Sequence, residues 1–252
     1  MPSRRGLNLD FNIFSIETGL QKRNWPWIVN IPKIPDKMSG GSPWPKISII
    51  TPSYNQGKFI EETIRSVLLQ GYPNLEYIII DGGSTDNSLE IIKKYEPWID
   101  YWVSEKDGGQ AEAINKGFAK ANGEIFAWIN SDDMLMPEAL HTVAQYFCQY
   151  PQIDMIYGTG RILDNSGEVL TDWRSRDFDL KTLLFGNYIC QPASFFRSKI
   201  FFEVGEIRTD LHYALDYDLW LRFAVNHQIK RIDPILGYDR RQNNSKTILC
   251  QV

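Results

Sequence analysis

Two adjacent acids, Asp132 and Asp133, end the most informative stretch of this sequence. They follow an apolar run over residues 124–129, and Pro137 then opens a predicted helix. A buried strand that ends at a carboxylate pair places these charges at the carboxyl edge of a sheet, where open α/β sheets bind their ligands. Two carboxylates there suit a hard divalent cation that in turn holds phosphate oxygens. The pair therefore indicates an enzyme that acts on a phosphorylated substrate.

Three other polar loops follow predicted strands upstream of the acid pair. Their candidate residues are Thr51, Ser53, Tyr54, Asp81, Asp107 and Gln110. Small hydroxyls and a Tyr at a strand end can hold a flat base and its ribose, and a carboxylate there can accept a hydrogen bond from a base N–H. Glycines after Asp81 and Asp107 allow the backbone to approach a ligand closely. An ordinary turn would explain any one of these loops. Together with the acid pair, however, the three loops would place polar side chains along one edge of the sheet, which we call the rim.

Alternating predicted strands and helices position this rim. The predicted strands cover residues 47–50, 75–80, 101–103 and 124–129. The predicted helices cover residues 61–69, 86–95, 110–121 and 137–150. This alternation indicates βαβ units, right-handed crossovers and a mostly parallel central sheet with helices on both faces.

The second half of the chain has a different pattern. Short strands are predicted at residues 153–157, 161–163, 168–171, 193–196, 229–232 and 235–238. A turn at residues 164–167 predicts a hairpin, and residues 179–185 and 215–225 predict helices. We therefore expect a small antiparallel region beside the parallel sheet.

Composition narrows the class of protein. A net charge of −4 without a long basic run argues against nucleic acid as a partner. Three sparse cysteines argue against a disulfide framework or a zinc site and indicate a reducing, cytoplasmic environment. No apolar run reaches the roughly 18 residues of a transmembrane helix. Residues 1–45 are rich in proline, and we expect an extended arm that lies on the main domain or, less favoured, on a membrane or partner.

Six motifs, in this order and spacing, resemble those of family 2 glycosyltransferases. They are residues 51–55, 81–86, 107–110, 115–117, 130–133 and 216–222. The resemblance runs from about Lys46 to Thr247. It implies an α/β GT-A fold, Rossmann-like, and an inverting transferase that uses a nucleotide-activated sugar. Residues 46–252 would form one domain, in which residues 46–135 bind the nucleotide sugar and residues 136–252 the acceptor.

The resemblance also implies a role for each candidate residue. The nucleotide-sugar site would comprise Thr51, Ser53, Tyr54, Asp81, Asp107, Gln110 and Asp132. In it, the residues after the first two strands would contact the base and ribose, Asp107 and Gln110 would line the nucleoside pocket, and Asp132 would touch the ribose or donor sugar. Asp133 would bind the metal, Mn²⁺ or Mg²⁺. Asp216 would be the general base.

Such a reaction needs these residue types for physical reasons. Departure of a nucleoside diphosphate leaves negative charge on phosphate, which a cation held by Asp133 would offset. Inversion by single displacement needs a base on the opposite face to take the acceptor's proton, and Asp216 at a helix start suits that task. A first-turn acid favoured by the helix dipole is the alternative for Asp216. Asp218 is predicted to be structural and to pair with Arg222, four residues on.

The sequence departs from the family pattern at two places. Gly82 stands where many relatives have a second acid, and Gln242 stands where relatives often have a His before Ser-Lys-Thr. A His ligand from this loop is therefore not expected. Arg240 and Lys246 would meet the diphosphate as a basic loop, or form a solvated turn. Gln191 would border the acceptor site, or lie in a simple loop.

The leading hypothesis is a metal-dependent hexosyl- or N-acetylhexosaminyl-transferase of cell-surface polysaccharide or glycolipid synthesis. A UDP-sugar is the favoured donor, and a glycan or lipid-linked sugar is the expected acceptor. Such an enzyme would work in the cytoplasm, with peripheral association at the inner face of the membrane. Two alternatives stay open: a nucleotidyltransferase, which would release pyrophosphate, and a non-catalytic nucleotide-sugar-binding module. The lack of a Gly-rich basic phosphate loop counts against the first, and the intact acids count against the second.

Overall fold

The computed structural model describes residues 26–27, 34–38 and 40–242. The strands in this part of the chain are β1 (Ile47–Ser53), β2 (Leu75–Asp81), β3 (Tyr101–Ser104), β4 (Ile125–Trp128), β5 (Met134–Leu135), β6 (Met155–Leu163), β7 (Val169–Asp172), β8 (Ser194–Arg197) and β9 (Ile229–Arg240). The helices are α2 (Ile60–Leu68), α3 (Ser88–Tyr95), α4 (Gln110–Lys120), α5 (Ala139–Gln149), α6 (Leu180–Leu183), α7 (Ser198–Val204) and α8 (Leu215–Asn226), with 3₁₀ turns η1 (Glu96–Trp98) and η2 (Gln191–Ala193). All nine strands form one sheet in the order β3-β2-β1-β4-β8-β6-β9-β5, with β7 paired to β6.

The first four strands form the parallel half of the sheet. β1 lies between β2 and β4, β3 follows β2, and all three pairings are parallel. Every residue of β1, β2 and β4 is buried, as expected for parallel strands rich in Ile and covered on both faces. In register, Ser53 lies beside Asp81 and Asp81 beside Ser104, so these strands end at one edge. The predicted parallel arrangement is confirmed.

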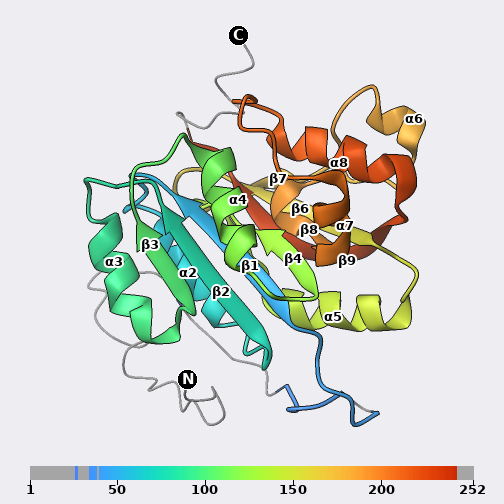
Figure 1. The fold of residues 1–252 in the computed structure, drawn as a ribbon, viewed down its shortest axis with the longest axis horizontal. Helices are drawn as coiled ribbons and strands as arrows, with labels where there is room; N and C mark the ends of the chain where they lie inside the picture. Colours follow the sequence, from blue (N-terminus) through green and yellow to red (C-terminus); the bar gives the residue numbers. More distant parts are fainter. Residues whose placement is uncertain (1–25, 28–33, 39, 243–252) are drawn as a thin grey trace.

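Helices cover both faces of this sheet (Figure 1). Successive residues of β1, such as Ile49 and Ile50, point to opposite faces and belong to two separate hydrophobic clusters. One cluster includes the apolar faces of α2, α3 and α5. The other includes those of α4, α7 and α8. The protein is thus a three-layer α/β structure, which confirms the predicted fold class.

The second half continues the same sheet and is larger than the predicted antiparallel region. β8 pairs antiparallel with β4, and β6 pairs antiparallel with β7 and β8 but parallel with β9. The hairpin between β6 and β7 is confirmed. β6 and β9 are each one strand where two were predicted, because register shifts around Gly158 and Pro234 absorb the interruptions.

Described parts of the N-terminal arm lie on the main domain. The backbone oxygen of Pro26 accepts a hydrogen bond from Arg65 Nε of α2 (3.2 Å), and the Arg65 guanidinium lies over the Trp27 ring. Trp44 is buried, and its Nε1 donates to the Pro35 backbone oxygen (2.8 Å). Most of the predicted arm, residues 1–25, 28–33 and 39, lies outside the described residues. Among the described residues, no helix has the length and hydropathy needed to cross a membrane.

Candidate active site

An open cleft of about 1440 Å³ lies where the loops after β1, β2, β3 and β4 meet the start of α8 and the end of β9. Typical single-ligand pockets occupy roughly 300–1,000 Å³, so this cleft has room for two substrates. The sequence-predicted residues that line it are Ser53, Tyr54, Asp107, Gln110, Asp132, Asp133, Gln191, Asp216 and Arg240. The structure therefore brings most of the predicted residues to one place.

Thr51 and Asp81 lie beneath the cleft and do not line it. Thr51 is fully buried, with its Oγ1 3.1 Å from the hydroxyl of Tyr77. The buried Asp81 carboxylate accepts hydrogen bonds from Ser104 Oγ (2.7 Å), from Ser84 Oγ (2.5 Å) and from the backbone N–H groups of Gly83 and Ser84. In this structure Asp81 shapes the loop after β2 and does not line the cleft. Lys246 lies outside the described residues.

The acid pair is held by two long-range contacts. Asp133 is buried, and its Oδ1 accepts a hydrogen bond from the backbone N–H of Arg240 (2.9 Å) while its Oδ2 accepts one from Asn130 Nδ2 (2.9 Å). Burial, together with the charges of Asp132 and Asp239, raises the pKa of Asp133 well above its ordinary value. Asp132 is only half-buried, and Gln242 Nε2 donates to its Oδ2. Asp132 thus presents the more open carboxylate to the cleft.

Asn130 connects the acid pair to two predicted site residues. Its Oδ1 accepts a hydrogen bond from Gln110 Nε2 (2.7 Å), and its Nδ2 donates to Gln191 Oε1 (3.1 Å) as well as to Asp133. Gln191 Nε2 in turn donates to the backbone oxygen of Trp128, at the end of β4. Gln110 and Gln191 therefore position the floor of the cleft through Asn130, which belongs to the motif of residues 130–133 but had no predicted role of its own.

Arg240 lines the cleft, but its guanidinium is bonded within the protein. Its side chain is 2% exposed, and its Nη2 lies 2.5 Å from Glu62 Oε2 of α2. Its Nε donates to the backbone oxygen of Asp132 (3.0 Å), and its guanidinium lies over the Phe59 ring. The guanidinium is turned into the protein, so the predicted phosphate role is replaced by a structural one: Arg240 holds the loop that carries the acid pair.

Asp216 enters the cleft from the first turn of α8. Its Oδ2 accepts a hydrogen bond from Asn187 Nδ2 (3.0 Å). Burial raises the pKa of Asp216, although hydrogen bonds from the backbone of Tyr217 and of Asp216 itself, and from Asn187, oppose the rise. The preceding N-cap residue, Ala214, has a left-handed conformation with φ of 56°, which few non-glycine residues adopt. Asn187 is a site residue that the sequence did not reveal.

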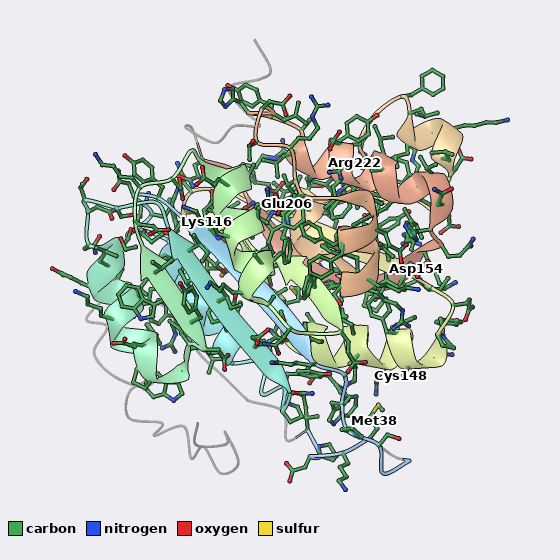
Figure 2. The ribbon with its side chains drawn as sticks, in the orientation of Figure 1. Met38, Lys116, Cys148, Asp154, Glu206 and Arg222 are labelled. Carbon is green, nitrogen blue, oxygen red and sulfur yellow. The ribbon has the colours of Figure 1, made fainter. Side chains whose placement is uncertain are left out.

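The predicted pairing of Asp218 with Arg222 is confirmed and fixes α8 in place. Arg222 Nε donates to Asp218 Oδ2 (2.9 Å). The remaining Arg222 nitrogens donate to the backbone oxygens of residues 204–206, the segment that follows α7, where Arg222 and Glu206 are labelled in Figure 2. Asp218 thus supports the helix that carries Asp216, and it does not line the cleft.

Asp239 is a further acid in the cleft that the sequence did not reveal. It lies near the end of β9 and has Arg241 Nε 3.8 Å away. Burial raises its pKa to about 6; Arg241 opposes this shift, and the charges of Asp132 and Asp216 add to it. Asp239 therefore lies close enough to both the acid pair and Asp216 to interact with each through charge.

A model of one protein family matches most of this chain. The model of "Glycosyl transferase family 2" matches residues 48–205, which is more than half of the sequence. The chain belongs to glycosyl transferase family 2. An uncharacterized glycosyltransferase of Mycobacterium tuberculosis is 30% identical to this family 2 chain over 184 residues, covering 72% of it and 70% of that protein. Chondroitin synthase of Escherichia coli is 27% identical over 206 residues, covering 81% of the chain but 30% of the synthase.

Solved structures show the same GT-A architecture for this family 2 glycosyltransferase. The structure of S. aureus TarS residues 1–349 in complex with UDP-GlcNAc matches with a TM-score of 0.67 at 21% identity, covering 79% of this chain and 60% of that one. The mannosyltransferase PcManGT from Pyrobaculum calidifontis, in complex with GDP-Man and Mn²⁺, matches with a TM-score of 0.60 at 18% identity. The match covers 80% of this chain and 58% of that one. These likenesses confirm the predicted GT-A fold.

Proposed function

We propose that this glycosyltransferase transfers a sugar, with inversion, from a nucleoside-diphosphate sugar to an acceptor hydroxyl. The observation that carries the proposal is one cleft lined by the Asp132–Asp133 pair, from the end of β4, and by Asp216, from α8. Inversion by single displacement needs the leaving diphosphate and the base on opposite faces of the sugar, an arrangement that two separate elements can supply. In this proposal residues 46–135 bind the donor and residues 136–252 contribute the acceptor side.

Asp216 acts in this proposal on the acceptor. Its carboxylate takes the proton of the acceptor hydroxyl while that oxygen bonds to the anomeric carbon of the sugar. The bond between the anomeric carbon and the phosphate oxygen breaks, and the nucleoside diphosphate leaves with the bonding electrons. A pKa raised by burial makes Asp216 a stronger base than an exposed Asp, and Asn187 fixes the orientation of the carboxylate.

The acid pair fits a divalent cation that is shared with the substrate. Among residues 26–27, 34–38 and 40–242, no group of three or more His, Cys, Asp or Glu is placed to hold a metal alone. Mg²⁺ in phosphoryl sites is commonly held by one or two carboxylates plus substrate phosphates, which matches Asp132 and Asp133. Bound there, Mn²⁺ or Mg²⁺ would offset the charge of the leaving diphosphate. We propose that both acids contribute, and that Asp132 provides the more open oxygen.

Ser53 supports the donor side of the proposal. Its Oγ is buried and has no hydrogen-bond partner within the described part of the chain, although Ser53 lines the cleft. Buried hydroxyls are normally bonded, so an open one at a cleft wall suits a ligand such as a ribose hydroxyl. The exposed ring of Tyr54 lies beside it on the rim.

The donor and acceptor classes are supported by the relatives. TarS, whose fold this chain shares, was solved with UDP-GlcNAc, which favours a UDP-hexose or UDP-N-acetylhexosamine as donor. Similarity to chondroitin synthase favours a glycan or lipid-linked sugar as acceptor, in synthesis of a cell-surface polysaccharide or glycolipid. In this proposal the enzyme works in the cytoplasm, at the inner face of the membrane where such acceptors grow.

A thermal-shift panel with UDP-, GDP- and dTDP-sugars, each with and without Mn²⁺, tests the donor proposal. A ligand that binds only the native state raises the melting temperature, so we expect the largest rise with a UDP-sugar and Mn²⁺ together. Asp132→Asn and Asp133→Asn should each remove the Mn²⁺-dependent part of that rise. Asp210→Asn, which changes an exposed acid paired to Arg208, is the matched control and should keep it.

Three results would contradict the proposal. No rise with any sugar nucleotide would exclude a nucleotide-sugar site. Release of pyrophosphate from a nucleoside triphosphate would favour the nucleotidyltransferase instead. Tight binding of a sugar nucleotide without sugar transfer to water or to any acceptor would favour the non-catalytic module.

Asn187→Leu should move the acidic limb of the pH profile of kcat/KM to higher pH. The change removes one of the hydrogen bonds that oppose the raised pKa of Asp216, so that pKa should rise further. Because the base must be deprotonated, a higher pH is then needed for the same activity. Rates of nucleotide release measured between about pH 4.5 and pH 9 give the position of this acidic limb of the kcat/KM profile. Asn165→Leu, in the exposed hairpin turn, is the control, and an active Asn187→Leu enzyme with the wild-type limb would contradict the assignment of the base.

A further inference from the structure

Arg241 lines the cleft with a guanidinium that is partly open to solvent. Its side chain is 27% exposed, whereas the neighbouring Arg240 is 2% exposed and bonded within the protein. The backbone N–H of Arg241 donates to the backbone oxygen of Leu163 (2.8 Å), which fixes the main chain to β6. The side chain is not fixed in this way: within the described part of the chain, its Nε has no hydrogen-bond partner although the atom is buried.

An ion-pair contact and a ring contact orient this guanidinium. Asp239 Oδ2 lies 3.8 Å from Arg241 Nε, which is longer than the roughly 3.2 Å limit of an N–H···O hydrogen bond. The guanidinium also lies over the Trp173 ring, 5.7 Å from its centroid, at a distance typical of a cation–π interaction. Neither contact is a hydrogen bond, so the N–H groups of Arg241 stay available to a ligand in the cleft.

Trp173 places Arg241 on the side of the cleft where Asp216 lies. The indole Nε1 of Trp173 donates to the backbone oxygen of Tyr188 (3.0 Å). Tyr188 directly follows Asn187, whose Nδ2 donates to Asp216 Oδ2 (3.0 Å). The ring beneath the guanidinium is thus bonded to the segment that orients the proposed base. Because an acceptor hydroxyl must lie at that base, Arg241 lies on the acceptor side.

The charges on this side explain why a free cation matters. Asp216 and Asp239 both line the cleft there, and two carboxylates repel an anionic ligand. A neutral sugar needs no cation beside it, whereas an acidic sugar needs one to offset this repulsion. A planar guanidinium also matches a carboxylate or phosphate with two parallel hydrogen bonds.

We propose that Arg241 selects an acceptor sugar that carries an acidic group, a carboxylate or a phosphate. The proposal rests on the proposed function and names the chemical class of its acceptor. The guanidinium binds the acidic group, and the hydroxyl that receives the sugar lies at Asp216. Trp173 keeps the guanidinium in place for this contact.

Rates of nucleotide release with matched acceptors test this assignment. Methyl glycosides of glucose, galactose and mannose are each supplied as the neutral sugar, as the uronate and as the 6-phosphate, with Mn²⁺ and the UDP-sugar that gives the largest thermal shift. We expect kcat/KM of the wild type for at least one acidic form to exceed that of its neutral partner by about 10- to 100-fold, as for a hydrogen bond between charged groups. The better of the uronate and the phosphate identifies which acidic group is bound.

Variants of the guanidinium and of its ring contact isolate the effect of charge. Arg241→Gln should remove the preference for acidic acceptors and leave both UDP affinity and the rate with neutral acceptors nearly unchanged. Arg241→Lys should keep part of the preference, because it retains the charge but not the planar pair of donors. Trp173→Leu should weaken the preference without removing the charge. Arg208→Gln, at an exposed ion pair with Asp210 outside the cleft, is the control and should behave as the wild type.

Equal use of neutral and acidic glycosides by the wild type, or use of neutral ones alone, would overturn the acceptor class and still support sugar transfer. The same holds if the wild type binds the UDP-sugar and uses none of the glycosides, except that transfer is then unsupported. An equal loss with all acceptors in Arg241→Gln, or a fall in its UDP affinity, would show that Arg241 serves the fold or the diphosphate instead. Failure of the wild type to bind any sugar nucleotide would overturn the proposed function itself.

Discussion

Asp216→Asn should lower the rate of sugar transfer about 100- to 10,000-fold, the usual contribution of a general base, and leave UDP affinity unchanged. The amide keeps the shape of the side chain and its place beside Asn187 but cannot take a proton at neutral pH. Initial rates of nucleotide release, with UDP affinity measured by calorimetry on the same samples, separate the catalytic effect from a binding effect.

Asp218→Asn is the matched control for this experiment. Asp218 lies on the same helix two residues further on, but it pairs with Arg222 and does not line the cleft. Asp218→Asn should lower the free energy of unfolding by at most about 1 kcal/mol and leave the rate of sugar transfer nearly unchanged. Wild-type turnover in Asp216→Asn, or an equal loss of turnover in Asp218→Asn, would remove Asp216 from the role of base.

Arg240→Met should lower the free energy of unfolding by about 3 kcal/mol, because it removes a buried cation whose partners, Glu62 and the backbone oxygen of Asp132, each lose a hydrogen bond. Arg240 is 2% exposed and bonds to Glu62 and to the backbone oxygen of Asp132. For a chain of this size, that loss corresponds to a fall in melting temperature of roughly 6–12 °C. Calorimetry or urea unfolding gives the value directly.

Arg161→Met, which breaks the more exposed pair with Asp172 on the β6–β7 hairpin, is the control and should cost at most about 1 kcal/mol. If the free energy of unfolding fell by the same small amount in both variants, Arg240 would not be the structural link that its contacts indicate. A stable Arg240→Met that fails to bind diphosphate would instead restore the phosphate-binding role predicted from the sequence.

The parallel half of the sheet could be predicted to within a few residues because its signal is local. Short Ile-rich runs separated by amphipathic helices define β1 and β2 in the sequence itself. In the second half, Gly158 and Pro234 interrupt apolar runs and were read as strand ends. The structure keeps β6 and β9 continuous because their partners tolerate the register shifts, which no single segment reveals.

The site could be located from the sequence, but the direction of individual side chains could not. A polar residue at a strand end lies near the cleft whichever way it turns: Asp107 faces the cleft, whereas Asp81 turns to the amides of its own loop. Asn187 and Asp239 belong to no local motif. Asn187 meets Asp216 across 29 residues of sequence, and only tertiary packing brings such single polar groups together.

The position of the acid pair depends on β9, a strand that is synthesised much later than the pair itself. Asp133 is bonded by the backbone of Arg240, 107 residues further along the chain, and β5, which follows the pair, is bordered by β9. At roughly 5–20 residues per second, the nascent chain carries both acids for about 5–20 s before β9 can fix them. We expect the parallel half of the sheet to form during translation, and the acid pair to reach its final position only when β9 emerges and pairs with β5 and β6.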